Sequence, residues 1–294
     1  MQKKILVLVC FSLLITLLSL TPVSAASPVV LNFRVTDTSE TRSASSPFTL
    51  PLEGVERISF LYSDAIDHST GQIIPAGRIS FTHHQQTVSA GQALEISPDQ
   101  RSQGISPEQP GAFTINIMFF PSDLPGKYEA IIEAVCQSAG GEEKRLPLLL
   151  KINVLPWIKL KSAIPNQTLI IDQVSFRGDT EIKARHPVSI LVASNAPWRL
   201  YMKIDSGLTG HRKPIPIALS VLPSTAYEGL NASIYPYEDY KLVAAGPPTV
   251  VGDRSGSVGY WTELVLSAEI PNAHLYPAGQ YTFILSFSAI TLEP

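Results

Sequence analysis

Short stretches in which apolar and polar residues alternate run through most of this 294-residue chain. A period of two places apolar side chains on one face of a β-strand, whereas an amphipathic helix needs a period of 3.6 residues. The 24 prolines and 18 glycines are spread along the chain rather than packed into one block, which suits many short strands joined by turns. The sequence therefore predicts an all-β fold. The clearest strands are expected at residues 29–35, 113–120, 128–136, 145–154, 198–204 and 281–290.

The first half of the chain ends in a characteristic order of elements. A strand is followed by a Pro/Gly turn at 121–126, a strand that begins with Tyr128, a hairpin loop at Gly140-Gly141 and a closing strand. Immunoglobulin-like sandwiches commonly end in this order. Further strands are expected at 48–52, 57–62, 79–81 and 94–96, with long loops at 36–46 and 97–111.

A second unit is expected to begin near Pro156, because proline cannot extend a strand ladder and holds the residue before it extended. Strands are predicted beyond it at 168–171, 188–193, 215–222 and 260–266, whereas 226–245 is ambiguous and could hold one helical turn. The fold class predicted is thus two tandem immunoglobulin-like β-sandwich domains after a signal peptide. The predicted domains are 1–25, 27–155 and 156–294.

Both halves contain the same entry to a strand, in which a glycine stands two residues before a tyrosine. Gly126 precedes Tyr128 in the first half, and Gly279 precedes Tyr281 in the second. The glycine permits a tight turn, and the tyrosine ring can cover the end of a sandwich while its hydroxyl reaches the backbone. This repetition favours a shared architecture for the two halves.

The N-terminus reads as a secretory signal peptide. Lys3 and Lys4 precede an apolar run from Ile5 to Leu20, and a small-x-small cleavage motif ends at Ala25. The alternative is an uncleaved membrane anchor, for which the run is short. Once this segment is removed, Cys136 is the single cysteine, so an internal disulfide is impossible and burial in a strand is expected.

Charge and hydropathy argue against a nucleic-acid partner and against a second membrane-spanning segment. Without Lys3 and Lys4, the chain carries 20 basic and 25 acidic residues and no basic cluster, so nucleic acid is not expected as a partner. The sequence has no second apolar run of membrane-spanning length. The mature protein is therefore expected to be secreted or to lie at the cell surface.

No catalytic, cofactor or metal signature emerges from the sequence, and none of these roles is assigned. His83 and His84 are adjacent on an expected strand, where alternation would point their rings to opposite faces. Asp64, Asp67 and His68 lack the spacing of a calcium loop and are expected in a solvated turn. The nucleophile-elbow, zinc-protease and phosphate-loop motifs do not occur.

One stretch concentrates exposed-looking aromatic and acidic residues. Aromatic faces stack on sugar rings or partner side chains, and carboxylates accept hydrogen bonds from sugar hydroxyls. The alternative is that the tyrosines cover the end of the sandwich. The surface-binding candidates are Tyr235, Tyr237, Glu238, Asp239 and Tyr240.

The second half partly resembles the WxL-type cell-surface domains of Gram-positive bacteria. Trp198-Arg199-Leu200 supplies a Trp-x-Leu after a turn, and residues 278–294 are similar to the closing strand of that family, with Phe287 where a second tryptophan is expected. The resemblance implies a β-sandwich held non-covalently on the cell wall. The first half resembles generic bacterial secreted immunoglobulin-like domains.

Three functions are compatible with these sequence features. The first is a non-catalytic structural or adhesive protein that contacts cell-wall glycan or other surface proteins. The second is a fimbria-like subunit that assembles by strand addition, for which residues 27–35 are the candidate spare strand. The third is an accessory domain of a carbohydrate-active enzyme.

Overall fold

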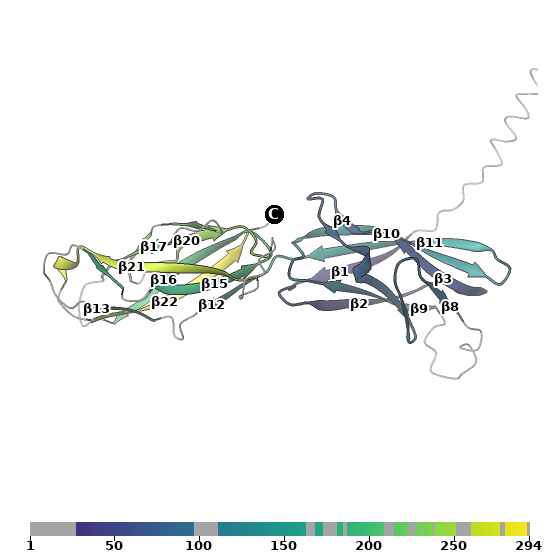
Figure 1. Ribbon diagram of the computed structural model, residues 1–294, viewed down its shortest axis with the longest axis horizontal. Coiled ribbons are helices and arrows are strands. Elements are labelled where there is room, and N and C mark those ends of the chain that lie inside the picture. Colours follow the sequence, from purple (N-terminus) through teal and green to yellow (C-terminus); the bar gives the residue numbers. More distant parts are fainter. Residues whose placement is uncertain are drawn as a thin grey trace, which may run out of the picture.

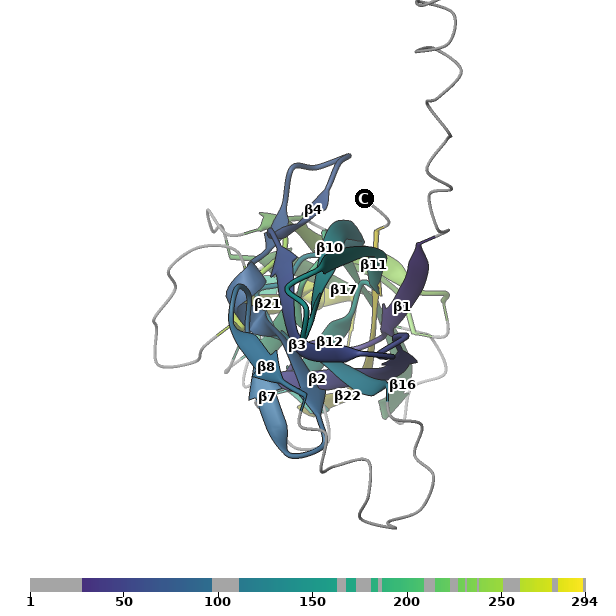
Figure 2. The same ribbon diagram turned by 90° about the vertical axis from the view of Figure 1, so that its right-hand side faces the viewer.

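The computed structural model describes two β-sandwiches that lie end to end along one axis (Figures 1 and 2). The described residues are 28–96, 111–162, 168–172, 181–184, 187–208, 215–222, 227–230, 232–236, 238–250, 260–276 and 280–292. Every regular element among them is a strand or a single 3₁₀ turn. The predicted all-β class with two tandem immunoglobulin-like sandwiches is confirmed.

The first sandwich packs a sheet of order β1-β11-β10-β3-β8, to which β4 and β5 add, against a sheet of order β2-β9-β6-β7. This division of strands is that of an immunoglobulin-like fold, with β1 running parallel to the closing strand β11. The elements are β1 (Val29–Val35), β2 (Arg42–Thr49), β3 (Val55–Tyr62), β4 (Ala65–Asp67), β5 (Ile73–Ile74), η1 (Ala76–Arg78), β6 (Ile79–His83), β7 (Gln86–Val88), β8 (Ala93–Glu95), β9 (Ala112–Phe119), β10 (Gly126–Ser138) and β11 (Glu143–Val154).

Aromatic side chains from both sheets fill the centre of the first sandwich. Phe60 of β3 stacks on Phe81 of β6 with ring centroids 3.8 Å apart. Phe48 and Phe113 stack on each other at 5.6 Å, and each meets Phe60 edge-on. These residues occupy the inward positions of their strands and are almost fully buried, as period-two alternation predicts.

The second sandwich packs a sheet of order β12-β15-β21-β17-β19, joined by β14, against one of order β13-β22-β16-β20-β18. Its strands are β12 (Ile158–Ser162), β13 (Thr168–Asp172), β14 (Glu181–Lys183), β15 (Val188–Ser194), β16 (Trp198–Leu208), β17 (Ile217–Val221), β18 (Glu228–Gly229), β19 (Ala232–Ile234), β20 (Lys241–Gly246), β21 (Thr262–Pro271) and β22 (Gln280–Thr291), with the 3₁₀ turn η4 (Ala273–Leu275).

The strand β16 supplies the centre of the second core. Trp198, Leu200, Met202 and Ile204 are each at most 1% exposed, so the predicted inward set is confirmed. Trp198 of the Trp-x-Leu motif is therefore a core residue. The indole lies so close to the backbone of Gly246 on the neighbouring strand that an added Cβ would stand 2.5 Å from it.

The tyrosine predicted to cover a sandwich end does so in the first domain. Tyr128 is buried, and its hydroxyl donates a 2.7 Å hydrogen bond to the carbonyl of Leu124, four residues upstream. Tyr281, its counterpart in the second half, is also buried. A buried phenol needs such a partner because an unpaired hydroxyl inside a protein is costly.

The structure corrects one sequence-based expectation about local structure and bears on two alternatives that the sequence left open. The loop expected at 36–46 ends earlier, because β2 begins at Arg42 and pairs with β9 along its whole length. Most of its hydroxyl residues are exposed, and serine-rich stretches are more typical of turns and loops than of strands. The helical turn considered within 226–245 is not found among the described residues there, which form short strands. The candidate spare strand is already paired, because Val29–Val35 lies beside β11.

Candidate functional site

The outer face of the sheet β1-β11-β10-β3 carries most of the exposed aliphatic side chains of the first domain. Ile131 of β10 is 67% exposed, and its cross-strand neighbour is Leu149 of β11, which in turn pairs with Val30 of β1. Leu61 of β3 pairs with Glu133 and is therefore a diagonal neighbour of Ile131. We call this set the aliphatic face; it comprises the exposed Val30, Leu61, Ile66, Ile73 and Ile131 and the half-buried Leu149.

The hairpin β4–β5 extends the aliphatic face at one edge. Ile66 pairs with Glu129 of β10 on one side and with Ile73 of β5 on the other, so all three side chains point outward. Ile73 is 51% exposed. Contiguous exposed apolar side chains on a soluble domain mark a surface that another molecule covers.

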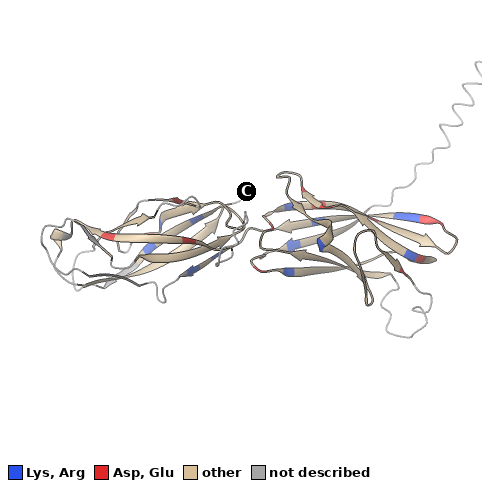
Figure 3. Cartoon of the chain, in the orientation of Figure 1, with Lys and Arg blue, Asp and Glu red and all other residues tan. Residues whose placement is uncertain are grey.

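Ion pairs flank the centre of the aliphatic face on both sides along the strands. Lys151 lies 3.4 Å from Glu129, on one side of the Ile131–Leu149 pair, and Arg145 lies 3.1 Å from Glu133 on the other. Figure 3 shows basic and acidic residues adjoining near the turn of the β10–β11 hairpin. An apolar centre with a polar rim is the usual anatomy of a protein–protein interface.

The outer face of the opposite sheet is different, because its side chains bond to one another. The Ser45 hydroxyl donates to Oδ1 of Asn116 at 2.7 Å, and Nδ2 of Asn116 donates to Thr82 at 3.0 Å. The hydroxyls of Thr82 and Thr87 lie 2.9 Å apart. This ladder ties four strands together, and its polar groups satisfy one another.

The two adjacent histidines lie in contact, contrary to the expectation from strand alternation. Their ring centroids are 4.3 Å apart, because His84 begins the β6–β7 turn with a φ of 51° and has left the strand. His83 is buried, stacks on Phe113 and hydrogen-bonds the carbonyl of Ala112 through Nδ1 at 2.8 Å. Burial and the neighbouring His84 lower the pKa of His83, so its ring is neutral at pH 7.

The described part of the tyrosine-rich stretch forms a tight turn on the second domain. Tyr235 and Tyr240 are each 42% exposed, and Asp239 is exposed between them. The Glu238 carboxylate accepts a hydrogen bond from the backbone N–H of Tyr235 at 3.3 Å and lies 3.6 Å from Lys241. Tyr237 lies outside the described residues.

A cation lies over one of these tyrosine rings. The ammonium of Lys203 on β16 is 5.2 Å from the ring centroid of Tyr240. The structure thus brings Tyr235, Glu238 and Tyr240 to one surface. The carboxylate already has protein partners, and no described contact defines a ligand there.

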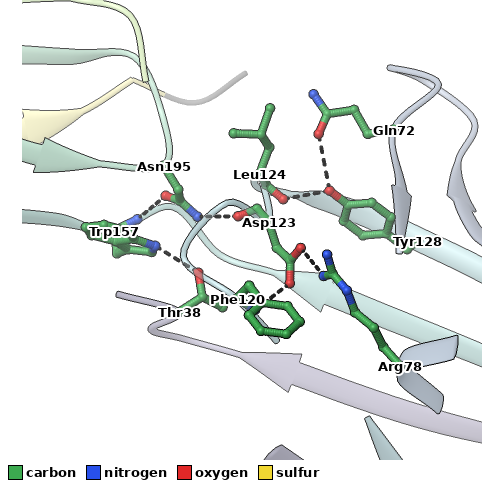
Figure 4. Close-up of polar contacts among 9 residues, drawn as sticks. All are labelled: Thr38, Gln72, Arg78, Phe120, Asp123, Leu124, Tyr128, Trp157 and Asn195. Carbon is green, nitrogen blue, oxygen red and sulfur yellow. Dashed lines mark hydrogen bonds and ion pairs between the residues drawn. The ribbon is translucent and has the colours of Figure 1, made fainter. Parts of the chain in front are cut away.

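A hydrogen-bonded junction joins the two domains (Figure 4). The buried side chain of Asn195 accepts from the Trp157 backbone N–H at 2.8 Å and donates to the Asp123 carbonyl at 3.2 Å. The indole N–H of Trp157 donates to the fully buried hydroxyl of Thr38 at 2.9 Å. Side chains of the second domain thus bond to the first at two points around the 155–157 connection.

Apolar contacts and an ion pair support the same junction. Leu124 of the first domain packs against Trp157 in a small cluster that also contains Ala193, Val250 and Trp261. On the first domain, Arg78 contacts Asp123 at 2.6 Å and lies 4.4 Å above the ring of Phe120. The turn that receives Asn195 is therefore itself fixed in place (Figure 4).

The predicted solvated turn at residues 64–68 contains a buried structural anchor instead. Asp67 is 3% exposed and accepts hydrogen bonds from the Ser69 hydroxyl at 2.6 Å and from the Lys127 backbone N–H at 3.2 Å. Burial alone would raise the pKa of Asp67, but these hydrogen bonds outweigh it and lower the pKa below its usual value. Asp64 is also structural, since it accepts from the Ala76 N–H at 2.7 Å.

Cys136 has the buried position expected for it. The side chain is 2% exposed on the inward face of β10. Burial raises the pKa of its thiol, and the positive charge of Lys144 offsets this only in part. A protonated, enclosed thiol is unreactive at neutral pH.

Two kinds of feature are absent from the described residues. They hold no cluster of three His, Cys, Asp or Glu side chains that could bind a metal ion. They also contain no helix long and apolar enough to cross a membrane.

Comparison with known proteins assigns no family. No family model matches the chain, and no curated protein sequence matches it significantly. The chain is similar to the chaperone–tip adhesion subunit complex from the Csu pili of Acinetobacter baumannii, at 14% identity over 90% of this chain and 99% of that one, with a TM-score of 0.43.

Two further solved structures are similar over most of their length. One is a mutant of CfaE, the CFA/I adhesin of enterotoxigenic E. coli, at 10% identity over 92% of this chain and all of that one, with a TM-score of 0.31. The other is the C-terminal domain of the AgI/II polypeptide BspA from Streptococcus agalactiae, at 8% identity over 89% and 87%, with a TM-score of 0.19. These scores are too low to transfer any property to this chain.

Sequence reasoning missed the aliphatic face and the junction. The face could have been noticed from the large side chains at outward positions of predicted strands, such as Ile131 between Glu129 and Glu133. The junction carried no such signal, because Asn195 in an Asn-Ala-Pro turn looks like an ordinary turn residue.

Proposed function

We propose that the protein is a non-catalytic structural or adhesive component exported from the cell, which contacts another protein through the aliphatic face. The observation that carries this proposal is the row Val30–Leu149–Ile131 on a sheet surface flanked by ion pairs. Export is supported by the signal peptide expected over residues 1–25.

The junction between the domains supports this proposal because it limits how far the domains can move relative to each other. Contacts from Asn195 and Trp157 across the junction restrict the angle between the domains, so the aliphatic face is held at a fixed position on an elongated molecule (Figure 1). A rigid spacer reduces the entropy lost when a partner is bound.

The proposal is tested by fractionating cells that produce Ile131→Ser, Met118→Ser or the parent protein. Met118 is the matched control, because it is 45% exposed but lies on the opposite sheet. The parent and Met118→Ser should stay with the cell surface, whereas Ile131→Ser should shift to the medium. If all three distribute alike, the aliphatic face does not retain the protein.

A second candidate is contact with a glycan through Tyr235 and Tyr240, whose rings are exposed on one turn. Aromatic faces of this kind stack on sugar rings. Tyr240→Ala should then reduce binding to purified cell-wall polysaccharide, while Tyr260→Ala, a change to a similarly exposed tyrosine elsewhere on the domain, should not.

Assembly by strand addition has less support. Its donor would be the N-terminal strand, yet β1 pairs with β11 over seven residues and buries Leu31, Phe33 and Val35 in its own domain. Removing it would expose that core.

A further inference from the structure

The order of charges on the aliphatic face fits a second copy of the same surface. Along β10, Glu129 and Glu133 stand on either side of Ile131, and along β11, Lys151 and Arg145 stand on either side of Leu149. Over this central stretch the outward charges of β10 are acidic and those of β11 are basic, with an aliphatic residue at the centre of each. Charges of the opposite sign, Lys127 on β10 and Glu143 on β11, lie beyond it at the strand ends, where Glu143 pairs with Arg145.

Two sheets can pack face to face with their strands aligned about a two-fold axis between them. If the axis runs along the strands, midway between β10 and β11, then β10 of one copy faces β11 of the other. Ile131 then meets Leu149 of the second copy, and Glu129 meets Lys151. Each acidic side chain meets a basic or neutral one.

The alternative axis, at right angles to the strands, is unfavourable. It places β10 over β10 in opposite directions, so Glu129 of one copy faces Glu133 of the other. Like charges brought together at a partly dehydrated surface repel. The charge order therefore selects one of the two symmetric arrangements.

The size of the face is near the lower end of what a specific interface needs. Four strands about 4.8 Å apart and roughly 8–12 residues long cover about 500–750 Å², compared with about 800 Å² per partner in a standard interface. The side chains at its centre, with Ile131 67% exposed, are those that gain most from being covered.

We propose that the protein self-associates through the aliphatic face as a two-fold dimer in which β10 of each copy faces β11 of the other. This inference rests on the proposed function and names its partner as a second copy of the chain. A face at the lower end of specific interfaces is typical of weak or transient association, so the dimer is expected to dissociate on dilution.

Sedimentation equilibrium of the purified protein, from about 1 µM to about 1 mM, tests the proposal. The apparent mass of the parent should rise from one chain to two. Ile131→Ser should remain a single chain throughout, and Met118→Ser on the opposite sheet should behave as the parent. Thermal melts check that each variant is folded.

A charge exchange tests the arrangement itself. Glu129→Lys places like charges within the face and across the dimer, and it should weaken association by about tenfold or more. Adding Lys151→Glu restores both pairings with the signs reversed, so the double variant should dimerise like the parent. Failure of the double variant to recover would overturn the proposed symmetry.

The outcomes also separate this inference from the proposed function. A parent that stays a single chain over the whole range overturns the dimer. If Ile131→Ser is nevertheless lost from the cell surface in the fractionation experiment, a different protein is the partner and the proposed function stands.

Discussion

The two domains bury different kinds of polar side chain. In the first domain, the buried set includes Asp67, His83 and Asp123, which can carry charge. In the described part of the second domain, the buried polar side chains are neutral: Ser194, Asn195, Thr249 and Thr262. A buried ionisable group stabilises only in the protonation state that its partners fit. The first domain is thus fixed partly by charge and the second mainly by packing around Trp198.

The largest expected effect tests the packing half of this comparison. Trp198→Ala should destabilise the second domain by about 3–5 kcal/mol, because it removes the largest side chain of that core. The first domain should keep its own unfolding transition. Calorimetry or thermal unfolding followed by circular dichroism would resolve the two.

The control for this prediction is Lys203→Ala on the outward side of the same strand. Its cation–π contact with the ring of Tyr240 contributes about 0.5–1 kcal/mol, well below the effect expected at Trp198. Should Trp198→Ala melt like the parent, the second core would not depend on this indole.

The next largest effect concerns the junction between the domains. Asn195→Ala leaves the buried Trp157 N–H and the Asp123 carbonyl without these partners, at a cost of about 1–3 kcal/mol. Small-angle X-ray scattering should also report a broader distribution of interdomain distances. Ser220→Ala, at an exposed position on β17, should change neither measurement.

A smaller effect is expected at the single described cysteine. Cys136→Ser should cost about 1–2 kcal/mol, because a hydroxyl replaces a buried thiol in an apolar setting. Cys136→Ala should cost less, and reductant should not alter the melt of the parent. Loss of folding in reductant would mean that the thiol is paired between molecules.

The smallest effect tests the charge half of the comparison. The folded-state pKa of His83 lies below that of the unfolded chain, so unfolding takes up a proton as the pH falls. The contribution of neutral His83 to the free energy of unfolding is present in full above about pH 6.5. It decreases as the pH falls towards the lower pKa that His83 has in the folded state. The melting temperature of the first domain should fall between pH 7.5 and 5.5, and His83→Gln should reduce that dependence. If the melting temperature of the second domain fell equally over this pH range, the proposed difference in buried charge between the two domains would be contradicted.

Much of the fold followed from the sequence because strand alternation is a local property. The inward set of β16 was predicted residue by residue, since apolar side chains at every second position leave one register that buries them. The tyrosine that covers one end of the first sandwich, Tyr128, was also predicted. The errors fell where local signals conflict, as in β2, whose serines resemble a loop.

The candidate sites were less predictable. The exposed tyrosine turn was found from composition, but the same method placed Asp67 in solvent and separated the rings of His83 and His84. Whether a carboxylate is buried depends on donors such as the Lys127 N–H, sixty residues away in the chain. A turn with positive φ reorients a side chain in a way that residue order does not reveal.

The sequence by itself determined the all-β class, the two sandwiches and the core position of Trp198, because burying alternate residues is the one arrangement that removes these apolar side chains from water. Only the tertiary structure decided that Val30, Leu149 and Ile131 form one row and that Asn195 reaches Asp123. Both depend on which distant strands become neighbours, and that choice is made by the packing of the whole domain.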